Sequence, residues 1–130
     1  MTALNLLIAG QSFAGFLVTD PVAKAALKEA FNRFDLDLTV YSSTYDGSSI
    51  LKANAPAAHP TWYWWNEDTD SAGPLLTSTM AYIGTIPVAS RPRRVLWLQG
   101  EGDSVRPNPD PDLFKAGTTS VLNAIKAALG

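Results

Sequence analysis

Residues 4–12 read Leu-Asn-Leu-Leu-Ile-Ala-Gly-Gln-Ser, an apolar run that ends in a glycine and two polar residues. A second such stretch, residues 95–101, reads Val-Leu-Trp-Leu-Gln-Gly-Glu. Nearly continuous hydrophobic residues are typical of strands in a parallel sheet that is covered on both faces. The carboxyl ends of parallel strands lie at one edge of the sheet, where open α/β sheets hold their binding crevice. We therefore expect Ser12 and Gln99 to lie near one another, in a layout suited to attack on an acyl group.

Helical patterns and one further strand lie between these two stretches. Asp20-Pro21 predicts a helix start, because aspartate caps helices and proline fits their first turn. Leu36–Tyr41 predicts a strand, whereas residues 10–19 and 52–72 are expected to be loop or irregular. The apolar stripe of the first helix consists of Ala23, Leu27, Ala30, Phe31 and Phe34.

Two more helices are predicted towards the carboxyl end. The first begins near Ser71 and buries Leu76, Met80 and Ile83. After Gln99 we expect a loop that contains Pro107, Pro109 and Pro111. The last helix places one set of apolar residues on a common side: Phe114, Val121, Leu122, Ile125 and Leu129.

Helices that alternate with apolar strands predict right-handed crossovers, and hence an α/β fold with three α/β/α layers around a parallel sheet. A chain of 130 residues has the size of one domain, which we expect to span residues 1–130. Val95–Leu98 lacks the charges that protect edge strands, so we expect it to be buried on both sides. Three strands make a thin sheet, so we expect something to cover or extend the third strand.

Composition excludes several classes of partner. The formal net charge is −2, and the one basic cluster, Arg91 with Arg93 and Arg94, is interpreted as the solvated entry to a strand, so we expect no nucleic-acid partner. There is no cysteine, so neither disulfides nor thiolate metal sites are expected. No apolar stretch is long enough to span a bilayer, so we expect no membrane partner. Met1 is followed almost at once by the first strand, without a signal peptide. We therefore expect a cytoplasmic or phage-particle-associated protein rather than a secreted one.

Three blocks in this order resemble the SGNH/GDSL hydrolase superfamily: Gly10-Gln11-Ser12, Asp46-Gly47-Ser48 and the stretch from Trp97 to Asp103. Within the superfamily the chain resembles the sialate O-acetylesterase and acetylxylan esterase branch, carbohydrate esterase family 6. The intervening residues 73–76 and 94–97 also fit this branch, so the resemblance covers nearly the whole chain. It implies a flavodoxin-like topology, here the amino-terminal part, apparently truncated after the third core strand.

The resemblance also implies roles for single residues. Ser12 corresponds to the nucleophile, and its backbone N–H, that of Gly47 and the side-chain amide of Gln99 correspond to the oxyanion hole. Donors of this kind suit an oxyanion, because each supplies a neutral N–H close to the acyl carbon. Glu101 and Asp103 are interpreted as carboxylates that brace their loop, and Gln11 either contacts substrate or stabilises its turn.

The sequence departs from the family at the catalytic base. A hydrolytic serine needs a base, normally a histidine oriented by a carboxylate. The family supplies both from an Asp-x-x-His block, which residues 1–130 do not contain. The single histidine, His59, precedes a proline, which favours an extended surface loop, so we interpret it as solvent-facing or substrate-contacting rather than as a base. Three explanations of this departure are open. A second polypeptide completes the domain, the chain is truncated, or the protein is a shortened relative of these esterases that kept the crevice and lost turnover.

The aromatic run Trp62–Trp65 has two interpretations. Exposed rings suit stacking on sugars, and Trp62 or Trp64 are the candidates for such a contact. Alternatively, the run forms a hydrophobic plug under a long loop, or a surface that docks a missing half of the domain. The pattern of residues leaves both open.

Together these features predict a serine esterase that removes O-acetyl groups from a carbohydrate, without a metal or organic cofactor. A second polypeptide, or a second copy of the chain, is the expected partner besides the acetylated carbohydrate. The alternative is a non-catalytic glycan-binding or assembly module that retains the same crevice. A flavodoxin-like nucleotide binder is disfavoured, because no glycine-rich phosphate loop follows the first strand.

Overall fold

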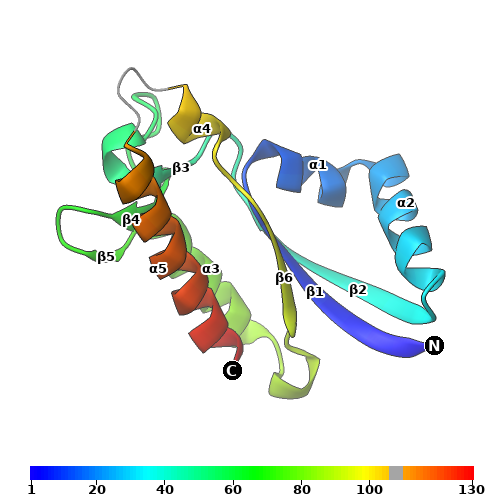
Figure 1. Ribbon diagram of the computed structural model, residues 1–130. Helices are drawn as coiled ribbons and strands as arrows, with labels where there is room; N and C mark the ends of the chain where they lie inside the picture. Colours follow the sequence, from blue (N-terminus) through cyan, green and yellow to red (C-terminus); the bar gives the residue numbers. More distant parts are fainter. Residues whose placement is uncertain (106–109) are drawn as a thin grey trace.

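The computed structural model describes residues 1–105 and 110–130 of a mixed α/β protein (Figure 1). The strands are β1 (Thr2–Gly10), β2 (Leu36–Thr44), β3 (Ser49–Leu51), β4 (Tyr63–Asn66), β5 (Ser71–Ala72) and β6 (Arg94–Leu98). The helices are α1 (Ser12–Thr19), α2 (Pro21–Asn32), α3 (Pro74–Thr85), α4 (Glu101–Ser104) and α5 (Pro111–Leu129), with short 3₁₀ turns η1 (Lys52–Asn54) and η2 (Val88–Ser90).

The main sheet has three parallel strands in the order β2-β1-β6. Gly10, the last residue of the central strand, lies opposite Thr44 of β2 and Leu98 of β6. The carboxyl ends of all three strands are therefore level. This register brings the turns that carry Ser12, Gly47 and Gln99 to one edge, as the sequence predicts.

Helices pack on both faces of this sheet, because both alternating sets of β1 side chains are apolar. Leu7 and Ala9 belong to one buried cluster together with residues of α3 and α5. Leu6 and Ile8 belong to a second cluster, to which α1 and α2 contribute. Figure 1 shows α1 and α2 on one side of the sheet and α3 and α5 on the other. The predicted α/β class with a parallel sheet is confirmed.

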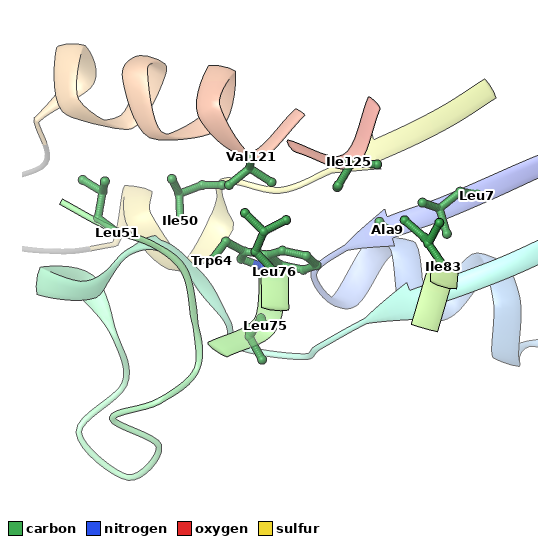
Figure 2. Close-up of a cluster of buried hydrophobic side chains, with 10 residues drawn as sticks. All are labelled: Leu7, Ala9, Ile50, Leu51, Trp64, Leu75, Leu76, Ile83, Val121 and Ile125. Carbon is green, nitrogen blue, oxygen red and sulfur yellow. The ribbon is translucent and has the colours of Figure 1, made fainter. Parts of the chain in front are cut away.

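The larger cluster joins the main sheet to a smaller sheet of order β3-β4-β5 (Figure 2). Trp64 of β4 is its largest member and has 0% exposure. Helix α5 packs closely on β3, since a Cβ at Gly117 would lie 2.9 Å from Ile50 Cγ2. The residues drawn are Leu7, Ala9, Ile50, Leu51, Trp64, Leu75, Leu76, Ile83, Val121 and Ile125.

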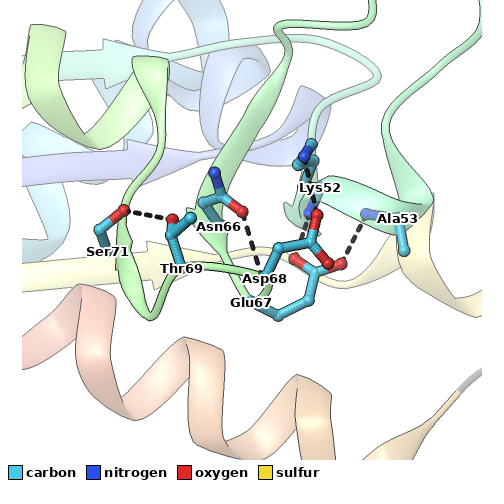
Figure 3. Close-up of polar contacts among 7 residues, drawn as sticks. All are labelled: Lys52, Ala53, Asn66, Glu67, Asp68, Thr69 and Ser71. Carbon is cyan, nitrogen blue, oxygen red and sulfur yellow. Dashed lines mark hydrogen bonds and ion pairs between the residues drawn. The ribbon is translucent and has the colours of Figure 1, made fainter.

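The smaller sheet corrects the prediction that residues 52–72 are irregular, since β4 and β5 lie within them. The turn between these strands is fixed by its carboxylates (Figure 3). Glu67 accepts hydrogen bonds from the backbone N–H groups of Lys52, at 2.8 Å, and Ala53, at 2.7 Å. Asp68 forms an ion pair of 2.7 Å with the Lys52 ammonium group. The two carboxylates thereby hold η1 against the end of β4.

The helices near the amino terminus also differ in part from the prediction. Residues 12–19 form α1 rather than a loop, because Ala14 is buried and Leu17 and Val18 pack against the second cluster. Asp20 caps α2 as predicted, accepting a hydrogen bond of 2.8 Å from the Ala23 N–H. The predicted stripe is too wide, since Phe34 lies beyond the end of α2 and is 78% exposed.

The later helices follow the prediction more closely. α3 begins at Pro74 rather than near Ser71, and it buries Leu76 and Ile83, whereas Met80 is half-buried. In α5, Val121 and Ile125 are fully buried. The expected loop after Gln99 contains the short helix α4, and its Pro107 and Pro109 lie outside the described residues. None of the helices described here is both long and apolar enough to cross a membrane.

Strand β6 corrects the expectation that Val95–Leu98 is doubly buried. Among the strands of residues 1–105 and 110–130, β6 pairs with β1 alone and so forms an edge of the sheet. Val95 and Trp97 pack on the first cluster, and Leu96 and Leu98 on the second. The apolar sequence of β6 is thus explained by the packing of each of its two faces against a different cluster. Each of these four side chains is nevertheless only half-buried.

Candidate functional site

Backbone contacts draw together the turns that follow the three parallel strands. Gly10 has a φ of +129°, and a Cβ there would lie 2.0 Å from the carbonyl oxygen of Leu98. The Gln11 N–H donates to this same carbonyl at 2.8 Å. On the other side, the Tyr45 N–H donates to the Gly10 carbonyl at 2.9 Å. Glycine at position 10 therefore lets all three turns approach one another.

Polar side chains connect the same three turns beneath the surface. Gln99 Nε2 donates to Gln11 Oε1 at 3.1 Å and to the carbonyl oxygen of Ser48 at 2.9 Å. Gln11 Oε1 also accepts from the Gly102 N–H at 3.1 Å. Gln11 is buried, with 4% of its surface exposed. The Gln11 side chain thus stabilises the turns, which is one of the two roles considered for it.

The orientation of both amides follows from their fixed backbone partners. The Gly102 N–H can only donate, so the Gln11 atom facing it is an oxygen. The Ser48 carbonyl can only accept, so the Gln99 atom facing it is the nitrogen. Both hydrogens of the Gln99 amide are consequently used within the protein. In this arrangement Gln99 is not the free oxyanion donor that the family resemblance implies.

Asp103 braces the turn after β6, as expected from its position in a loop. Its carboxylate accepts from the Ile50 N–H at 2.7 Å, the Leu51 N–H at 3.4 Å and Asn54 Nδ2 at 2.9 Å. The residue is 3% exposed, so these bonds offset the cost of burying its polar atoms. Glu101 begins α4, and its side chain lies outside the described part of the structure.

Ser12 is the first residue of α1 and is exposed. It borders a surface hollow of about 450 Å³ together with Thr44, Tyr45, Asp46 and Trp62. On another side it borders a hollow of about 310 Å³ with Phe13 and Phe16, which are 66% and 55% exposed. Within residues 1–105 and 110–130, no side chain forms a hydrogen bond with its hydroxyl.

Two backbone N–H groups at this edge of the sheet have the character that an oxyanion hole requires. The Ser12 N–H belongs to the first turn of α1, where helices leave N–H groups without intrahelical partners. Gly47 is exposed with a φ of +74°, and no acceptor in the described part of the chain takes its N–H. Asp46, the residue before Gly47, shares the larger hollow with Ser12.

The aromatic run divides between surface and core. The exposed imidazole of His59 stacks on the half-buried Trp62, with ring centroids 3.9 Å apart and planes at 12°. Trp64 is fully buried, packs against Tyr45 and Trp97, and donates from Nε1 to Ser48 Oγ at 3.1 Å. This burial excludes Trp64, one of the two candidates, from contact with a sugar and agrees for this residue with the alternative of a hydrophobic plug. Trp62 remains a candidate for that contact.

Ser48 and Asn54 also belong to this network, although neither is predicted from the sequence. Ser48 is fully buried, and its hydroxyl lies 3.4 Å from Gln99 Oε1. Ser48 could have been predicted from its position directly after Gly47 in the second sequence block. No local sequence feature indicates the role of Asn54. Among the residues that the structure describes, no three His, Cys, Asp or Glu side chains gather in a way that could hold a metal ion.

Comparison of the chain with protein-family models, with curated proteins and with solved structures finds no match. The observations that bear on function are therefore the geometry at this edge of the sheet and the motifs in the sequence.

Proposed function

We propose that this chain carries the nucleophile and oxyanion donors of a serine acyl hydrolase of the SGNH type, acting on an O-acetylated carbohydrate. The main support is the position of Ser12, which is exposed at the start of α1, between hollows of different chemistry. The strand order β2-β1-β6 is compatible with the first three strands of a flavodoxin-like sheet.

In the proposed reaction, Ser12 Oγ attacks the ester carbonyl and a base takes the hydroxyl proton. The Ser12 and Gly47 N–H groups hold the resulting oxyanion, with the amino end of α1 adding a favourable dipole. Collapse expels the sugar alcohol, which takes a proton from the base, and leaves an acyl-serine. Water then attacks the acyl-serine and releases acetate and Ser12.

Gln99 enters this proposal mainly as a positioning residue. Its amide ties the turn after β6 to Gln11 and to the Ser48 carbonyl. It reaches an oxyanion only when one of these two bonds is exchanged for the new one. Removal of its side chain would then loosen the relative placement of Ser12 and Gly47.

The proposed base comes from outside the described residues, on a second polypeptide or a further segment. His59 stacks on Trp62, which borders the same hollow as Ser12, but no hydrogen bond joins the imidazole to the serine. A base contributes about 10²–10⁴-fold to such reactions. We therefore expect slow turnover by residues 1–130 alone and a marked gain when a base is supplied.

Release of p-nitrophenol from p-nitrophenyl acetate tests this proposal, with free imidazole added as the replacement base. Imidazole also hydrolyses this ester without protein, so Ser12→Ala at the same imidazole concentration is the matched control. The proposal predicts that the wild-type chain exceeds Ser12→Ala by at least about tenfold in the presence of imidazole. Equal rates for the two proteins would show that Ser12 of this chain does not catalyse ester hydrolysis.

The alternative function is a non-catalytic glycan-binding or assembly module. It is favoured by one observation, namely that both hydrogens of the Gln99 amide are already used. In that case carbohydrate binding would persist in both the wild-type chain and Ser12→Ala, while their rates of ester hydrolysis would remain equal. The same experiment therefore separates the two functions.

A further inference from the structure

The outer edge of β6 lacks the features that keep sheet edges from pairing. In the described part of the chain β6 pairs with β1 alone, and an edge strand turns a row of unpaired N–H and C=O groups away from its neighbour. Arg94, the first residue of β6, is its only exposed side chain. The opposite edge strand, β2, instead carries the exposed polar residues Asp37, Thr39 and Ser42. Of the two edges of the main sheet, β6 is therefore the one suited to a further strand.

Apolar side chains on both faces of β6 are incompletely covered. Val95 and Trp97 on one face are half-buried, and so are Leu96 and Leu98 on the other. Leu98 also borders a surface hollow of about 410 Å³ together with Phe13, which is 66% exposed. A neighbouring strand covers both faces at once, because paired strands place their side chains next to one another on each face. The surface thus fits a strand that is apolar on both faces, and β6 is itself such a strand.

Charged side chains of opposite sign lie at the two ends of β6. At its start, Arg93 and Lys126 border a hollow of about 610 Å³, and neither side chain has an ion pair or hydrogen bond among the described residues. At its other end, Asp110 borders a hollow together with Gln99, and the exposed Asp112 follows in the first turn of α5. A second β6 placed antiparallel to the first would set the basic end of one copy beside the acidic end of the other. The charges of this edge are therefore complementary to themselves.

We propose that two copies of the chain form a two-fold dimer, in which their β6 strands pair antiparallel through these outer edges. A two-fold interface of this kind is closed, so pairing stops at the dimer. The joined sheet runs β2-β1-β6 in one copy and continues through the same strands in reverse order in the other. Leu96, the middle residue of β6, lies opposite Leu96 of the second copy, and Arg94 lies opposite Leu98, so that no like charges face each other. The dimer goes beyond the proposed function and does not rest on it.

Sedimentation equilibrium over a wide range of protein concentration measures the association. We expect the mass to rise from that of one chain to that of two and to go no higher. Arg93→Glu should weaken the dimer about tenfold, because it places a carboxylate beside the acidic end of the second copy. Adding Asp112→Lys to the same chain should restore the affinity. Lys28→Glu is the matched control, because it makes the same charge reversal at an exposed position of α2 and should leave the association unchanged.

Cross-linking tests the position of the interface, and the absence of cysteine from the sequence makes single cysteine variants unambiguous. In Leu96→Cys the two Cα atoms of the dimer would lie about 4.5–5.5 Å apart, as in any directly opposed antiparallel pair, which is within the range of a disulfide. Asp37→Cys places an exposed thiol on the opposite edge strand, β2, and is the matched control. Under mild oxidation we expect Leu96→Cys to form the covalent dimer at least about tenfold faster than Asp37→Cys. Circular dichroism checks that both variants are folded.

The proposed dimer requires all of these results. The mass of a single chain at every concentration overturns it and leaves the β6 edge to a different polypeptide or to a further segment. A dimer that Arg93→Glu leaves unchanged, or in which Leu96→Cys cross-links no faster than Asp37→Cys, uses another surface and overturns it equally. Ser12→Ala should dimerise as the wild-type chain does, so the dimer and the proposed ester hydrolysis stand or fall separately.

Discussion

The Gln99 amide donates to Gln11 Oε1 over 3.1 Å, although the two residues lie 88 positions apart in the chain. This bond joins the turn after β1 to the turn after β6. Gln99 also donates to the Ser48 carbonyl, so the turn after β2 belongs to the same unit. The turns that carry Ser12 and Gly47 are thus tied together by an amide pair, in which Gln11 is buried and Gln99 is half-buried.

The amide pair should show energetic coupling in a double-mutant cycle. Gln11→Met leaves the Gly102 N–H and the Gln99 amide without an acceptor, which should lower the free energy of unfolding by about 1–3 kcal/mol. Gln99→Met should cost a similar amount, and the double variant should lose less than the sum, with a coupling of about 0.5–3 kcal/mol. Urea unfolding measures all three. Asn123→Ala, on the exposed side of α5, serves as a neutral control, and strict additivity would contradict the coupling.

Asp103→Asn should destabilise the turn after β6. The carboxylate accepts from two backbone N–H groups and from Asn54, whereas an asparagine amide offers one oxygen and turns an N–H₂ group toward donors. We expect a loss of about 1–3 kcal/mol in the free energy of unfolding. Hydrogen exchange at Ile50 and Leu51 should also quicken. Unchanged protection at these two amides would show that Asp103 does not hold β3.

Gly10→Ala should be far more harmful than a glycine replacement elsewhere. Its Cβ would meet the Leu98 carbonyl at 2.0 Å, and its φ of +129° is a conformation that only glycine adopts readily. We expect loss of the β1–β6 pairing and a fall in thermal midpoint. Gly84→Ala in α3 is the matched control, because its Cβ meets nothing within 4 Å and should stabilise the helix by about 1 kcal/mol. Similar effects of the two changes would contradict the predicted crowding.

Lys52 should titrate above the ordinary lysine value. Its hydrogen bond to the Asp68 carboxylate raises the pKa of the ammonium group, and the nearby charge of Asp68 adds to this. Because the folded-state pKa is raised, the associated stability is present below the usual value of 10.5 and is lost as pH rises through the folded-state value. An NMR titration should show the Lys52 pKa falling in Asp68→Asn, and an equal pKa in both proteins would exclude the pairing.

Much of the sheet could be predicted from sequence, because continuous apolar runs report strands with two covered faces. The same signal misled for β6, since Val95–Leu98 contacts both clusters through its faces while its outer backbone edge has no strand partner among the described residues. Hydrophobicity reports the faces of a strand and carries no information about its edges.

The elements that sequence missed depend on tertiary contacts. Gly15 weakened the helical pattern of α1, but its missing Cβ is what allows Asp46 to approach at close range. The run Trp62–Trp65 has no alternation of polar and apolar residues, so the burial of Trp64 in β4 was not visible locally. The Gln11–Gln99 bond likewise depends on the fold that brings distant turns together.

Acetylation of Ser12 is the most direct test of the central claim. The chain is incubated with p-nitrophenyl acetate and imidazole, quenched in acid and digested, and its peptides are mapped by mass spectrometry. We predict that the acetyl group resides on the Ser12 hydroxyl and is absent from that peptide in Ser12→Ala. An unmodified Ser12, with acetyl groups found only on lysines and the amino terminus, would contradict the account.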